Sequence, residues 1–110
     1  MSEQRSQWIE AAQTGDVPDG GMLQTVAGGE LLCLYNLAGR IYATQAFCTH
    51  GGAELSLGYI AGEEIECPLH QGCFHIPSGR ATREPCSIDL RAYPVRIENG
   101  AVLVDIAPPT

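Results

Sequence analysis

Cys48-Thr49-His50-Gly51-Gly52 and Cys67-Pro68-Leu69-His70-Gln71-Gly72 are the two stretches of this chain that decide its fold. Each contains one thiol, one imidazole and at least one glycine. Thiolates are soft metal ligands and neutral imidazole is a borderline one, so a site with both suits iron or zinc. We therefore expect one metal site that takes its ligands from two separate loops: Cys48, His50, Cys67 and His70.

The spacing of these ligands distinguishes the two metals. Zinc modules usually pair like with like, as in C-x-x-C followed by H-x-x-x-H. Here each loop mixes the two types, as C-x-H and then, after sixteen residues, C-x-x-H. The mixed pairs resemble the Rieske [2Fe-2S] motif, and the flanking sequences CTHGGAELSLGYI and IECPLHQGCFHIPSGRA are similar to the two cluster loops of small Rieske ferredoxins. The resemblance extends, more weakly, from Trp8 to the final strand.

The resemblance implies how one [2Fe-2S] cluster would be held. Cys48 and Cys67 would bind the buried iron. His50 and His70 would bind the outer iron, with their imidazole edges toward solvent or a partner. Pro85 resembles part of the family's proline-bearing third loop, which shields the cluster. Neutral imidazoles leave the cluster less negative than four thiolates would, which is why such clusters have potentials of about −150 to +300 mV rather than roughly −400 mV.

Four positions that are not ligands indicate the lower end of that range. High-potential respiratory Rieske proteins have a second cysteine pair that bridges the loops, and Ser and Tyr hydroxyls that bond to the cluster. Ala53 and Leu69 stand at the positions of that pair, Gly72 at that of the Ser and Phe74 at that of the Tyr. Without two charge-assisted bonds of about 1.5 kcal/mol each, we expect a potential lower by on the order of 100 mV.

Composition limits the class of protein. At 110 residues we expect a single domain, residues 1–110, with cluster-binding loops at about 47–85. Thirteen acidic residues against six arginines and no lysine give a net charge of −7, which argues against nucleic acid as a partner. No apolar run approaches the roughly twenty residues that a membrane span needs. Five is an odd number of cysteines, and four of them could not be paired without using the two ligand thiols, so we expect a cytoplasmic protein without a membrane partner.

Short strand patterns separated by turns predict an all-β fold. The best local signal is Asn99-Gly100 between two apolar runs, which predicts a hairpin with a two-residue turn. Frequent turn signals favour a small antiparallel Rieske-type sandwich or barrel, with a cluster-binding subdomain inserted as two loops. We expect an irregular segment or one helical turn at 54–62, and strands at 22–26, 30–35, 40–47, 63–66, 74–76, 95–98 and 102–106.

The remaining cysteines and histidine are expected to have no redox role. Cysteine is among the most buried residue types, so Cys33 and Cys86 are predicted to be structural, and Cys73 is predicted to be a passive thiol near the site. A Cys-His hydrolase would explain only one of the two pairs. His75 is the one histidine outside the motif, and its alternation with Phe74 predicts a surface position. A single spare histidine cannot build a two-His-one-carboxylate iron site, so we expect an electron carrier and not an oxygenase.

The favoured hypothesis is a one-electron carrier that resembles the ferredoxins of bacterial aromatic-ring-hydroxylating dioxygenases, which serve aromatic hydrocarbon catabolism. Its expected partners are a flavin-dependent NAD(P)H ferredoxin reductase and a Rieske non-haem iron terminal oxygenase. Each would dock transiently at a tip formed by His50 and His70, and we expect the carrier to be a monomer. Two alternatives stay open: the small Rieske subunit of another redox enzyme such as nitrite reductase, and a zinc-stabilised binding module without redox activity.

Overall fold

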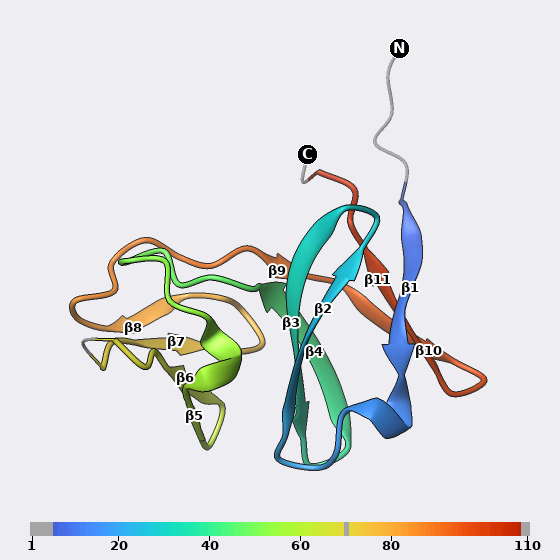
Figure 1. Cartoon of the computed structure of the whole chain (residues 1–110), viewed down its shortest axis with the longest axis horizontal. Helices are drawn as coiled ribbons and strands as arrows, with labels where there is room; N and C mark the ends of the chain where they lie inside the picture. The colour runs from blue at the N-terminus through green and yellow to red at the C-terminus, as the bar shows by residue number, and fades with distance from the viewer. Residues whose placement is uncertain (1–5, 70, 109–110) are drawn as a thin grey trace.

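A computed structural model describes residues 6–69 and 71–108, and most of its regular elements are β-strands (Figure 1). Among the described residues the only helical segments are two short 3-10 turns, η1 (Thr14–Asp16) and η2 (Leu55–Leu57). The pairings between strands are antiparallel, so the predicted all-β antiparallel fold is confirmed. The strands are β1 (Trp8–Gln13), β2 (Met22–Ala27), β3 (Glu30–Leu37), β4 (Arg40–Gln45), β5 (Tyr59–Ala61), β6 (Glu64–Glu66), β7 (Cys73–His75), β8 (Ala81–Arg83), β9 (Ala92–Tyr93), β10 (Val95–Glu98) and β11 (Ala101–Asp105).

The strands form three sheets, with the orders β1-β11-β10, β2-β3-β4-β9 and β5-β6-β7-β8. In Figure 1 the first two sheets make up one half of the molecule, and the third sheet lies in the other half. All of the third sheet comes from residues 46–91, the inserted region between β4 and β9. The insertion that was expected as two loops therefore also has a sheet of its own, and strands β6 and β7 of this sheet flank the second loop.

Strand β3 connects two hydrophobic cores. Leu32 and Leu34 lie in a core that includes residues of the first two sheets. Cys33 and Tyr35, which alternate with them, lie in a second core that is shared with the inserted region. Both faces of β3 are buried, and this is why its sequence is a continuous apolar run instead of an apolar-polar alternation.

The predicted hairpin is confirmed. Strands β10 and β11 pair with Glu98 opposite Ala101, which leaves Asn99 and Gly100 as the turn. Their φ angles are 51° and 80°, and a type I′ turn needs positive φ at both positions. The local sequence was therefore enough to predict this connection.

Several strand boundaries differ from the prediction. Strand β3 continues to Leu37, because Asn36 is buried within the strand and does not begin the turn: its Nδ2 donates to the Val17 carbonyl at 2.8 Å, and its Oδ1 accepts from Gly39 N–H at 2.7 Å. Strand β4 ends at Gln45, two residues earlier than expected. Strands β1, β5, β8 and β9 were not predicted. Strands β5 and β8 are three residues long and form only by pairing within the inserted sheet. None of the helical segments in the described part of the chain has the length or apolar character needed to cross a membrane.

Candidate metal centre

The two predicted ligand loops follow strands β4 and β6. Loop one is residues 46–54 and loop two is residues 67–72. Cys48 and Cys67 are buried, with 4% and 0% of their surface exposed, whereas His50 is exposed. His70, the fourth predicted ligand, lies outside the described residues. Loop one thus places a thiol inside the protein and an imidazole at its surface.

Both loops close on themselves in the same way. The backbone N–H of Cys48 donates to the Ala53 carbonyl at 2.8 Å. The backbone N–H of Cys67 donates to the Gly72 carbonyl, also at 2.8 Å. Each loop is therefore pinned by its cysteine to a carbonyl five residues later, although the two sequences have different lengths between cysteine and histidine.

The two sulfur atoms also have matching environments. His50 N–H donates to Cys48 Sγ at 3.3 Å, and Leu69 N–H donates to the Cys67 sulfur. Burial raises the pKa of both thiols, and these N–H groups act in the opposite direction because they stabilise the thiolate. Each of the two thiols affects the pKa of the other, so the structure brings Cys48 and Cys67 near each other. Two adjacent buried sulfurs that accept backbone N–H bonds are a donor set that fits an iron–sulfur cluster.

Backbone conformation shapes the two loops differently. Loop one turns at Gly51 and Gly52, whose φ angles of 87° and 72° favour glycine. Among the described residues of loop two, Gln71 has a positive φ of 61°. Gly72 is required for another reason: a Cβ there would lie 2.3 Å from Cys86 Sγ and 3.0 Å from the Cys86 backbone nitrogen. Only a residue without a side chain allows this close approach.

A third segment, residues 84–90 between β8 and β9, contacts both loops. Cys86 Sγ lies 3.7 Å from Cys48 Sγ, and Thr49 Oγ1 donates to the Ile88 carbonyl at 2.5 Å. Figure 1 shows the connection from β8 to β9 passing beside the loop that follows β4. The segment contains Pro85, so its position agrees with the shielding role that the resemblance implied.

Cys86 is the site residue whose position the sequence interpretation missed. It was expected to be structural, yet its buried thiol contacts the sulfur of Cys48. Burial raises the pKa of the Cys86 thiol. Cys86 is not spaced from another cysteine or histidine as a metal ligand would be. The available signal for a place at the site was its position next to Pro85, in the segment expected to cover the cluster.

The other two cysteines behave as predicted. Cys33 is fully buried in strand β3, where burial raises its pKa to about 12. Cys73 is 5% exposed, and its Sγ lies 4.0 Å from the Gln71 carbonyl. It is close enough to Cys86 to affect that thiol electrostatically. Cys73 is therefore a thiol near the site, as expected.

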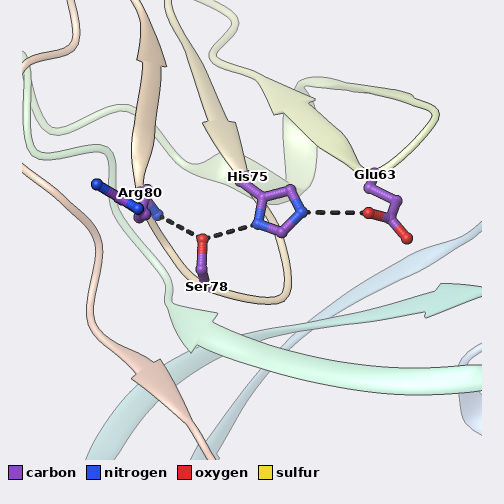
Figure 2. Close-up of polar contacts among 4 residues, drawn as sticks. All are labelled: Glu63, His75, Ser78 and Arg80. Carbon is purple, nitrogen blue, oxygen red and sulfur yellow. Dashed lines mark hydrogen bonds and ion pairs between the residues drawn. The ribbon is translucent and has the colours of Figure 1, made fainter.

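His75 has a structural position outside the site (Figure 2). Its Nε2 lies 3.1 Å from Glu63 Oε1, and its Nδ1 lies 2.7 Å from Ser78 Oγ. The backbone N–H of Arg80 donates to the same Ser78 hydroxyl at 3.2 Å. Phe74 is fully buried and His75 is partly exposed, which confirms the alternation predicted from the sequence. The ring connects the turn before β6 with the turn between β7 and β8.

The fold and the loops can be compared with known proteins. Residues 7–94 match the family model described as the Rieske [2Fe-2S] domain. The chain is 46% identical over 100 residues to the ferredoxin component of the naphthalene 1,2-dioxygenase system of Pseudomonas putida, an alignment that covers 91% of this chain and 96% of the relative.

Solved structures give the same result. The Sphingomonas yanoikuyae B1 ferredoxin superposes with a TM-score of 0.85 at 39% identity, over 90% of this chain and 98% of that one. A ferredoxin in a complex of reduced oxygenase and oxidized ferredoxin in carbazole 1,9a-dioxygenase superposes with a TM-score of 0.82 at 33% identity, over 89% of this chain and 92% of that one.

Proposed function

Because the chain belongs to the Rieske [2Fe-2S] domain family, we propose that it works as the ferredoxin component of an aromatic dioxygenase system. Its cofactor is one Rieske-type [2Fe-2S] cluster, which when bound accepts and releases one electron. The chain is an electron carrier and not the component that acts on the aromatic substrate. Its electrons go to a Rieske oxygenase, which is the kind of partner found with the related ferredoxin of carbazole 1,9a-dioxygenase.

We propose that the four motif residues hold the cluster: Cys48 and Cys67 on the inner iron, His50 and His70 on the outer iron. The observation that carries this assignment is the matching pair of loops, in which each cysteine sulfur accepts an N–H from the residue two positions later. Such N–H groups stabilise negative charge on the sulfurs, which favours the reduced state. The 84–90 segment lies against loop one, where the thiols of Cys48 and Cys86 are both buried.

The exposed tip of the site is the proposed docking surface for both redox partners. His50 is exposed there, so its imidazole provides a short route for the electron to leave. Two exposed apolar side chains lie at the site: Leu69 of loop two, which is 47% exposed, and Ile88 of the 84–90 segment, which is 66% exposed. A small apolar contact suits a carrier that must bind and release quickly, because transient redox complexes bury little area.

The electron donor in this proposal is a flavin-dependent NAD(P)H ferredoxin reductase, as the resemblance implied. We also propose that residues 1–110 form one domain with cluster-binding loops at about 47–85, and that the carrier is a monomer. Five free cysteines suit a reducing compartment, which supports a cytoplasmic location.

The decisive experiment is a spectroscopic redox titration of the purified protein, followed by reconstitution with a reductase and an oxygenase. We expect a red-brown protein with two irons and two acid-labile sulfides, an EPR signal of mixed Cys and His ligation after reduction, and a midpoint potential toward the low end of the Rieske range. A colourless protein with stoichiometric zinc and no sulfide would refute the electron-transfer function. Obligate copurification with a large sirohaem enzyme would instead assign the chain to a nitrite reductase.

A further inference from the structure

Cys86 is a buried thiol at the site that the four-ligand set does not use. It is 4% exposed and belongs to the same hydrophobic core as Cys48 and Cys67. Its Sγ lies 3.7 Å from the Sγ of Cys48, a distance at which one sulfur donates a hydrogen bond to the other. No strand holds Cys86, so the question is what keeps it there.

Contacts on three sides fix this thiol. Its backbone N–H donates to the Arg83 carbonyl at 3.2 Å, at the end of β8. Its sulfur fills the space where a side chain of Gly72 would start, because a Cβ at that position would lie 2.3 Å from it. Two residues later the Ile88 carbonyl is bound by the hydroxyl of Thr49 in loop one, at 2.5 Å. Cys86 is therefore held between the two ligand loops.

The chemistry of the pair decides which sulfur is the donor. A cysteine that binds iron does so as a thiolate and has no proton to give. The proton between the two sulfurs must then belong to Cys86, whose S–H is a weak donor. A donor to a ligand sulfur withdraws negative charge from it and so favours the reduced, more negative cluster.

We propose that Cys86 is a positioning residue for electron transfer: its thiol donates a hydrogen bond to the Cys48 sulfur and raises the midpoint potential of the cluster. This inference rests on the proposed function, because it needs Cys48 to be an iron ligand. In this proposal the 84–90 segment influences the midpoint potential of the cluster as well as covering it.

The test compares midpoint potentials of Cys86→Ala and Cys86→Ser with the wild-type protein, all with the cluster bound. For Cys86→Ala the equilibrium constant for reduction should fall about threefold, which for one electron is roughly 30 mV. Cys86→Ser keeps a donor at the same position, so its potential should return most of the way to the wild-type value. Cys33→Ala is the control, since it removes a buried thiol that belongs to strand β3 and not to the site.

The outcomes are distinct. A Cys86→Ala protein with an intact cluster and the wild-type potential would overturn the inference while leaving the proposed function in place. A change from one type of ligation to another in the EPR spectrum of Cys86→Ala would overturn it too, because Cys86 would then be an iron ligand. A colourless wild-type protein would refute the proposed function itself.

An infrared measurement covers the case in which Cys86→Ala does not retain the cluster. In the double variant Cys33→Ala and Cys73→Ala, the one remaining thiol outside the ligand set is Cys86. Its S–H stretching band should shift on reduction of the cluster, because the charge on its acceptor changes. A band that stays unchanged between the two redox states would contradict the hydrogen bond.

Discussion

Replacing Gly72 by alanine tests whether the 84–90 segment is packed against loop two. An alanine Cβ would lie 2.3 Å from Cys86 Sγ, 3.0 Å from the Cys86 nitrogen and 3.1 Å from the Arg83 carbonyl oxygen. Two of these three atoms belong to the backbone, so a change of rotamer alone cannot relieve the contact. The sulfur would have to move by at least about 1 Å to restore an ordinary contact distance.

The loss of stability caused by this displacement can be estimated. Overpacking a filled site typically destabilises a protein by about 1–3 kcal/mol, which for a chain of this size corresponds to a melting temperature lower by roughly 5–15 °C. Moving the segment also separates Cys86 from Cys48 and admits water to the thiols. We therefore expect faster loss of the visible absorbance of the cluster, and a midpoint potential that falls as it does in Cys86→Ala.

The assay is thermal unfolding of the cluster-loaded protein, with the rate of bleaching followed at a fixed temperature. Gly15→Ala is the matched control, because Gly15 has no positive φ and a Cβ there meets nothing within 4 Å. The free energy of unfolding of Gly15→Ala should lie within about 0.5 kcal/mol of the wild-type value. If Gly72→Ala has the same melting temperature and bleaching rate as Gly15→Ala, the packing of the segment against loop two is refuted.

Four further substitutions test the site and the fold. Cys67→Ser should abolish the visible spectrum and lower the melting temperature, whereas Cys33→Ala should stay coloured; a red-brown Cys67→Ser protein would contradict the ligand assignment. Phe74 is a fully buried ring in the same core as Cys67. Phe74→Tyr should raise the midpoint potential by about 40 mV if its hydroxyl donates to a cluster sulfur. An unchanged potential would mean that Phe74 does not correspond to the tyrosine of high-potential Rieske proteins. Ile88→Asp should raise the KM of the oxygenase for the ferredoxin about fivefold without changing the spectrum, and an unchanged KM would exclude the tip as the docking surface. Asp105→Asn should lower stability at pH 7 by less than about 1 kcal/mol, and a difference that persisted at acid pH would argue against a role for its charge.

The expected pH dependence at Asp105 follows from its contacts. Its Oδ1 accepts the backbone N–H of Gln7 at 2.8 Å and that of Ala107 at 3.0 Å. These bonds favour the carboxylate and lower its pKa. A group with a lowered folded-state pKa stabilises the protein above its ordinary pKa, and this contribution is lost as the pH falls through the folded-state value. The wild type and Asp105→Asn should therefore converge in stability as the solution becomes acidic.

Much of the fold could be predicted because its signals are local. The Asn99-Gly100 turn needs only two residues with positive φ, and the apolar run at 30–35 was enough to predict a strand there. Strands β5 and β8 could not be predicted in this way. They are three residues long, and their hydrogen bonds go to partners within the inserted sheet, so their conformation depends on pairing.

The sequence by itself determined the chemistry of this protein. The order and spacing of Cys48, His50, Cys67 and His70 pointed to mixed sulfur and nitrogen ligation, because ligand type is a property of each side chain and needs no neighbour. The environment of the two proposed cysteine ligands was decided by the tertiary structure. Cys86 is separated from Cys48 by 38 positions in the chain, and it reaches that sulfur only because Gly72 leaves room for it. Contacts of this kind result from packing between distant segments, which leaves no periodic or spacing signal in the sequence.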